Sequence, residues 1–195
     1  GIFDLSYLSS IPNMTIMAPK NKWELSDMMK FAVNYGGPIA LRYPRGEAYD
    51  GLQEFRAPIA YGKSEWIYEE ADIALMAVGS MVKTAEKVRD TLKDTGYNCT
   101  LINARFVKPI DEQMLEEVAR QHKLLVTLEE NVRNGGFGDH VLEYVNDRGF
   151  NMKVLNIALP DEYVEHGNVA LLHKEVGLDA ETIVKRVITA YVGEM

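Results

Sequence analysis

The stretch Pro38-Ile39-Ala40-Leu41-Arg42-Tyr43-Pro44-Arg45-Gly46 decides how this chain folds. Its apolar half follows two glycines, and a short apolar run bracketed by glycine and proline is typical of a buried central strand in a parallel sheet. Pro44 has no backbone N–H, so the strand ends before it. In open α/β sheets, ligands bind beyond the carboxyl ends of such strands, where Arg42 and Arg45 lie.

Two guanidinium groups at this place indicate an anionic ligand. The planar arginine fork matches the oxygens of a phosphate or carboxylate two at a time. The same spacing fits two arginines that form ion pairs at the surface or between domains. The spacing alone leaves both interpretations open.

The rest of the chain alternates helical and strand patterns, which predicts an α/β fold with right-handed crossovers and a mostly parallel sheet. Asn21 or Lys22 precedes the second helix, Gly36 ends it, and Ser80 and Asp179 are expected caps. The expected helices cover residues 4–10, 24–35, 81–95, 111–121 and 138–146, and a last helix follows Asp179 with Ile183, Val184, Val187 and Ile188 on one face. The expected strands cover residues 14–18, 38–41, 64–68, 73–78, 99–103, 124–128 and 153–157.

Composition restricts the function classes. The net charge of -8 disfavours nucleic acid as a partner, and no apolar run approaches the about 20 residues of a membrane span. The single Cys99 cannot form an internal disulfide, which fits a reducing compartment. We read Cys99 as a strand residue, because nothing in the sequence supplies a base that would activate it.

Three further features are candidate sites. Gly135-Gly136-Phe137-Gly138 precedes a helix but lacks the dinucleotide and P-loop spacings, so a tight turn is favoured over a phosphate loop. Glu129 and Glu130 are adjacent in a strand and must point to opposite faces, which favours a structural or subunit-contact role for at least one of them. His122 ends a helix and is expected to interact with its dipole, and His166 lies in a loop marked by proline and glycine.

Several stretches together resemble the 1-deoxy-D-xylulose-5-phosphate synthase family, thiamine-diphosphate-dependent relatives of transketolase. The resemblance covers essentially the whole chain, and the order and spacing of the stretches are more specific than any one of them. They are Gly1-Ile2-Phe3-Asp4-Leu5-Ser6-Tyr7-Leu8, Ile11-Pro12-Asn13-Met14, Leu41-Arg42-Tyr43-Pro44-Arg45-Gly46, Ala104-Arg105-Phe106-Val107-Lys108-Pro109-Ile110-Asp111, Glu129-Glu130-Asn131 with the glycine turn, and Leu159-Pro160-Asp161-Glu162-Tyr163-Val164-Glu165-His166-Gly167.

The resemblance implies a C-terminal fragment in three segments. Residues 1–55 would be the C-terminal half of a pyrimidine-binding domain, residues 56–71 a connector, and residues 72–195 a transketolase C-terminal domain. The family's catalytic histidine and aspartate precede Ile2-Phe3-Asp4 and would lie outside the chain, as would the residues that bind thiamine diphosphate and Mg²⁺. The fragment alone is therefore expected to be inactive, with no catalytic, cofactor-binding or metal-binding residue of its own.

The whole enzyme, by resemblance, condenses pyruvate with D-glyceraldehyde 3-phosphate and releases CO₂, in the route to isoprenoid precursors. Arg45 is expected to bind the acceptor's phosphate, with Arg42 and Tyr43 as weaker substrate-binding candidates. A cytoplasmic homodimer is implied. Two alternatives remain open: a transketolase or 2-oxoacid dehydrogenase β-type chain, and a separate non-catalytic subunit that completes a thiamine enzyme with a partner chain.

Overall fold

The computed structural model describes residues 1–193, and within them it contains two β-sheets and the helices that cover them. The first part of the chain forms α1 (Asp4–Ser9), β1 (Thr15–Met17), α2 (Lys22–Asn34) and β2 (Ile39–Leu41). The remainder forms β3 (Glu65–Tyr68), β4 (Asp72–Ala77), α3 (Met81–Asp94), β5 (Cys99–Asn103), β6 (Phe106–Lys108), α4 (Glu112–Gln121), β7 (His122–Val132), α5 (Phe137–Asp147), β8 (Lys153–Leu159), α6 (Val169–Glu175) and α7 (Ala180–Val192). The last two residues of the predicted third segment lie outside the described residues.

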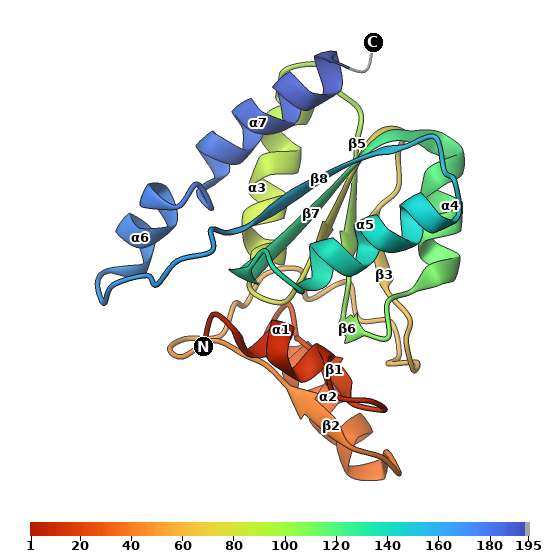
Figure 1. Ribbon diagram of the computed structural model, residues 1–195, viewed down its shortest axis with the longest axis vertical. Coiled ribbons are helices and arrows are strands. Elements are labelled where there is room, and N and C mark those ends of the chain that lie inside the picture. Colours follow the sequence, from red (N-terminus) through yellow and green to blue (C-terminus); the bar gives the residue numbers. More distant parts are fainter. Residues whose placement is uncertain (194–195) are drawn as a thin grey trace.

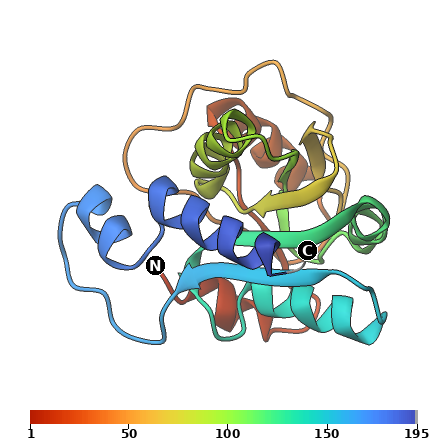
Figure 2. The ribbon, with the colours of Figure 1, turned by 90° about the horizontal axis from the view of Figure 1, so that it is seen from above.

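The larger sheet has the strand order β3-β5-β4-β7-β8, in which only β3 is antiparallel to its neighbour among the described strands. Helices α3 and α7 cover one face, and α5 covers the other (Figure 2). Its central strands β4, β5 and β7 are buried on both faces along most of their length, and β4 is accordingly apolar from Ile73 to Ala77. The predicted α/β fold with a mostly parallel sheet is confirmed.

The smaller sheet has the order β2-β1-β6 and joins the two parts of the chain (Figure 1). Strand β1 pairs in parallel with β2 and in antiparallel orientation with β6, which follows β5 directly in the sequence. Arg105 lies between β5 and β6 with a φ of 60° and turns the chain from one sheet into the other. Leu5 and Ile16 therefore pack in the same apolar cluster as Met76 of the larger sheet.

The prediction that residues 38–41 form a buried central strand is wrong for the described residues. β2 is the edge strand of the smaller sheet, and its three residues are half-buried. Ile39 and Leu41 pack against the apolar residues of α2, including Met28. An apolar run therefore identified the strand, but it carried no information about which strands pair with it.

Helix starts were predicted well where a side chain caps them. Asn21 accepts a hydrogen bond from the Glu24 amide, and Asp179 caps α7 in the same way. Ser80 is the N-cap residue of α3, as predicted, but its hydroxyl makes no capping hydrogen bond and donates to Glu130 Oε2 at 3.1 Å instead. Gly36 does not end α2 through a left-handed turn, because the chain leaves the helix in an extended conformation at Tyr35.

The sequence patterns did not predict β6 and α6, and they predicted β7 too short. β6 has only three residues, and α6 has no buried residue, so neither leaves an apolar period in the sequence. β7 continues beyond Leu128, because Val132 still pairs with Leu159 of β8. Glu129 and Glu130 therefore lie inside β7.

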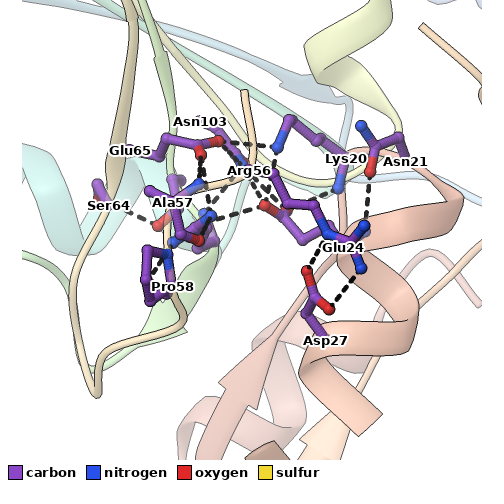
Figure 3. Close-up of polar contacts among 12 residues, drawn as sticks. Lys20, Asn21, Glu24, Asp27, Arg56, Ala57, Pro58, Ser64, Glu65 and Asn103 are labelled. Atoms are coloured by element: carbon purple, nitrogen blue, oxygen red, sulfur yellow. Dashed lines mark hydrogen bonds and ion pairs between the residues drawn. The ribbon is translucent and has the colours of Figure 1, made fainter. Parts of the chain in front are cut away.

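A buried ionic cluster, composed of Lys20, Glu24, Glu65, Asn103 and Arg105, connects the two parts of the chain (Figure 3). Lys20 Nζ lies 3.1 Å from Glu24 Oε2 and 2.8 Å from Glu65 Oε1. Arg105 contacts the same two carboxylates at 3.0 Å each. Asn103 donates to both Glu24 oxygens at 2.9 Å. Two cations thus neutralise two carboxylates in a site that excludes water.

The cluster also fixes the connector that follows β2. Arg105 donates to the carbonyl oxygens of Ala57 and Pro58 at 2.7 and 3.1 Å, and Glu65 accepts from the Ala57 amide at 3.0 Å. The Lys20 amide donates to Glu24 at 2.9 Å, which holds the loop after β1. One set of buried charges therefore positions both the loop after β1 and the connector after β2.

We predict that Arg105→Met destabilises the fold by about 3 to 5 kcal/mol, because Glu24 and Glu65 would keep buried charges with only Lys20 to compensate them. The matched control is Arg148→Met, which breaks the half-exposed pair with Glu116 and should cost less than about 1 kcal/mol. Urea denaturation of both variants measures the difference. Equal losses of stability would show that the cluster is not a principal link.

Candidate functional site

A hollow of about 530 Å³ lies where the carboxyl ends of β1, β2 and β4 come together. The loop after β1 (residues 19–21), the segment after β2 (residues 43–50) and the start of α3 line it. Gly79 makes the tight turn from β4 into α3, with a φ of 55°, and a Cβ there would lie 3.0 Å from the Ala18 Cβ. The hollow is therefore built by loops at strand ends, where α/β proteins bind their ligands.

Arg45 lines this hollow and is exposed to solvent. Among the described residues its guanidinium has no carboxylate within ion-pair distance. Tyr43 lines the same hollow with a side chain that is 58% exposed. The position supports the anionic-ligand interpretation for Arg45 over the surface ion pair that the sequence left equally open.

Arg42 faces a different environment, because its donors are used within the protein. Its guanidinium donates to the carbonyl oxygens of Gly1, at 2.7 Å, and of Glu130, and it lies 3.4 Å from Asp4 Oδ2. Arg42 therefore connects the end of β2 to α1 and β7. Asp4 is the first residue of α1, and Phe3 is at the N-cap position.

Lys83 also lines the hollow, besides Arg45 and the ion-paired Lys20, and sequence reasoning missed it. Its ammonium lies 5.2 Å from the ring centre of Tyr49, and the Tyr49 hydroxyl donates to Glu86 at 2.7 Å. Burial, with the Glu86 carboxylate beside it, raises the pKa of Tyr49 to about 12. The hollow also carries two carboxylates, those of Glu47 and Asp50, so its lining is not uniformly positive.

Glu129 and Glu130 point to opposite faces of β7, as predicted. Glu129 accepts from the amides of Phe137 and Gly138 at 3.1 and 2.6 Å, so it occupies the start of α5. Burial outweighs these donors and raises the pKa of Glu129 to about 7. The structural role expected for one of the two glutamates is confirmed.

The glycine turn before α5 serves this packing. A Cβ on Gly136 would lie 2.9 Å from the Val132 carbonyl oxygen, and one on Gly138 would lie 2.7 Å from Thr127 Oγ1. The amides that a phosphate would need are already bound by Glu129. The tight-turn interpretation is therefore correct, and the phosphate-loop alternative does not fit.

Glu130 is on the face of α3 and α6, where it links three elements. It accepts from Ser80 Oγ, and one of its oxygens lies 3.5 Å from His173 Nε2 on α6. Because Ser80 lines the hollow, this chain of contacts runs from α6 to the site. The sequence offered no signal for His173, since α6 itself was not predicted.

The other singled-out residues lie apart from the hollow. His122 Nδ1 contacts the Val118 carbonyl oxygen at 2.7 Å at the end of α4, and burial lowers its pKa, so the contact with the helix end is that of a neutral imidazole. His166 is exposed. Burial raises the pKa of Cys99 to about 12, which keeps the thiol protonated and unreactive.

Two further features are absent from residues 1–193. No group of three or more histidine, cysteine or acidic side chains there could hold a metal ion. None of the helices in this range combines the length and apolar character needed to cross a membrane.

Two family descriptions match the chain in succession. Residues 1–50 match "Transketolase, pyrimidine binding domain" and residues 62–183 match "Transketolase, C-terminal domain". Among curated proteins, the chain is 48% identical over 188 residues to the 1-deoxy-D-xylulose-5-phosphate synthase of Lachnoclostridium phytofermentans and 47% identical over 194 residues to that of Clostridium acetobutylicum. The alignments cover 96% and 97% of this chain but only 30% and 31% of those proteins.

Solved structures support the same fold. A structure described as a split-gene transketolase, inactive β4 tetramer, is 25% identical, with a TM-score of 0.91 over 100% of this chain and 63% of that one. The transketolase of Campylobacter jejuni has a TM-score of 0.69 and 18% identity, over 95% of this chain and 27% of that one. The chain thus spans less than a third of the length of the curated relatives named above.

The His173–Glu130 pair predicts that α6 docks in a pH-dependent way. The contact with Glu130 raises the pKa of His173 above 6.5, and the contact with His173 lowers the pKa of Glu130 below 4.5. The pair therefore contributes fully between these two values. Its contribution is lost as the pH rises above 6.5 through the folded pKa of His173, or falls below 4.5 through that of Glu130.

Hydrogen exchange of residues 169–175, corrected for the intrinsic pH effect, should show more protection at about pH 6 than at about pH 8. His173→Gln should remove this difference, because glutamine does not titrate. His166→Gln, at the exposed histidine, is the control and should retain it. The assignment fails if His173→Gln keeps the pH dependence of the original chain.

Proposed function

Because this chain belongs to the transketolase family, we propose that it forms the C-terminal part of a 1-deoxy-D-xylulose-5-phosphate synthase. The enzyme would condense pyruvate with D-glyceraldehyde 3-phosphate and release CO₂, which makes it a transferase of isoprenoid precursor biosynthesis. The support is 48% identity to such a synthase over 96% of the chain. We also propose a cytoplasmic homodimer, on the family resemblance alone.

The cofactor belongs outside this chain. The described residues do not fit a diphosphate with its metal ion: the amides at the start of α5 are bound by Glu129, and no acidic or histidine cluster of residues 1–193 could hold a metal. We therefore assign thiamine diphosphate and Mg²⁺ to other parts of the enzyme. The contribution of this chain is to bind and orient a substrate.

The observation that carries the proposal is Arg45, an arginine without an acidic partner among the described residues, in a hollow at the ends of three strands. A phosphate bound there would accept two parallel hydrogen bonds from the guanidinium fork. The acceptor aldehyde carries such a phosphate, whereas pyruvate does not. Tyr43, exposed in the same hollow, is assigned a secondary contact with the acceptor. Arg42 would act indirectly, by holding the end of β2 against α1 and β7.

One alternative has a specific observation in its favour. The TM-score of 0.91 with a split-gene transketolase chain favours a separate subunit that needs a partner chain for activity. Phosphate binding by Arg45 would serve this case too, because transketolase acceptors are sugar phosphates. A 2-oxoacid dehydrogenase β-type chain would have no use for Arg45. Activity with pyruvate as the donor distinguishes the synthase from a transketolase.

We predict that Arg45→Ala in the intact enzyme raises the KM for D-glyceraldehyde 3-phosphate about tenfold to a hundredfold and leaves the KM for pyruvate nearly unchanged. The expected loss follows from a charge-assisted hydrogen bond worth roughly 1.5 to 3 kcal/mol. Arg45→Lys should recover part of it, because a point charge replaces the fork. Steady-state kinetics with each substrate varied in turn gives the answer.

The control is Arg120→Ala, since Arg120 is an exposed arginine of α4 that does not line the hollow. It should change neither constant. Equal increases in both constants for Arg45→Ala, or an increase for pyruvate alone, would contradict the assignment of Arg45 to the acceptor.

A further inference from the structure

We infer that Lys83 is a second phosphate-binding residue of the hollow, which would make the C-terminal half of the chain part of the acceptor site. The inference rests on the proposed role of Arg45. Lys83 and Arg45 line the same hollow of about 530 Å³ from different elements, α3 and the segment after β2. Neither has a carboxylate within ion-pair distance among the described residues.

The position of Lys83 in its helix points to an anion. Lys83 lies in the first turn of α3, and that turn contains no acidic residue. A positive charge at a helix N-terminus is unfavourable, because the helix dipole already makes this end positive. An anion in the hollow would attract both the Lys83 ammonium and the positive end of the helix dipole. Without an anion, these two positive groups repel each other.

The surroundings of Lys83 keep its ammonium at the hollow. It lies 5.2 Å from the centre of the Tyr49 ring, which also lines the hollow. The hydroxyl of that ring is fixed by Glu86, at 2.7 Å, and the raised pKa of Tyr49 keeps the hydroxyl protonated and donating. Glu86 is thereby occupied by Tyr49, although it lies one turn after Lys83 on the same helix. The Tyr49 ring therefore lies beside the ammonium at the hollow, and no ion pair joins Lys83 to Glu86 among the described residues.

The chemistry of the lining identifies the ligand class. A phosphate monoester offers three oxygens, of which the arginine fork takes two and a lysine can take the third. Glu47 and Asp50 add two carboxylates, which accept hydrogen bonds from hydroxyl groups. Cations and carboxylates together suit a small phosphorylated hydroxyaldehyde better than a ligand that is anionic throughout. The acceptor of the proposed reaction, D-glyceraldehyde 3-phosphate, is a ligand of this kind.

The test is Lys83→Ala in the intact enzyme, assayed with D-glyceraldehyde 3-phosphate and, separately, with D-glyceraldehyde, which lacks the phosphate. We expect the KM for the phosphorylated acceptor to rise about tenfold, as for loss of one charge-assisted contact. The activity with D-glyceraldehyde and the KM for pyruvate should stay unchanged. Lys83→Arg should restore most of the affinity, because it keeps the positive charge.

The matched control is Lys87→Ala, an exposed lysine one turn further along α3 that does not line the hollow, and it should behave like the unchanged enzyme. If Arg45→Ala weakens the phosphorylated acceptor and Lys83→Ala does not, the inference about Lys83 is wrong and the proposed function stands. If neither variant changes the KM for the phosphorylated acceptor, the inference about Lys83 and the assignment of Arg45 to the acceptor are both wrong. If Lys83→Ala reduces activity with D-glyceraldehyde to the same degree, the lysine is structural and the inference is overturned.

Discussion

The buried ionic cluster of Lys20, Glu24, Glu65, Asn103 and Arg105 is the constraint on which the rest of the structure depends. Burying four charges is costly unless each finds a partner, and here each carboxylate contacts both cations. This arrangement is possible only when α2, β3 and the turn between β5 and β6 are all in place. The loop after β1 and the connector then have fixed positions, and the hollow with Arg45 lies between them and α3.

Local elements could be predicted from the sequence because their signals are local. A continuous apolar run revealed β4, the shorter apolar pair Leu101-Ile102 indicated β5, and single capping residues such as Asn21 and Asp179 marked helix starts. Sheet order could not be predicted, since pairing between β1 and β6 depends on residues about ninety positions apart. The ionic cluster was invisible for the same reason, and because charged residues are expected at the surface.

The site was predicted in part. The rule that ligands bind at strand carboxyl ends placed Arg45 correctly at a hollow, although the strand before it is an edge strand. The same rule predicted that Arg42 also faces a ligand. Only the structure shows that its guanidinium contacts Gly1, Asp4 and Glu130. Lys83 resembled any lysine on an exposed helix face. Its one sequence signal was a basic first turn without an acidic residue.

The passage of the chain from β5 into β6 has a consequence for how such an enzyme can be divided. Because β6 completes the sheet of β1 and β2, the segment matching the C-terminal domain supplies a strand to the segment matching the pyrimidine-binding domain. A gene break or a protease cut within residues 51–61 would separate two halves of one apolar cluster, that of Leu5, Ile16 and Met76. Each half would expose a surface suited to aggregation. The position at which this fold could be divided into stable subunits therefore differs from the boundary between its two family domains.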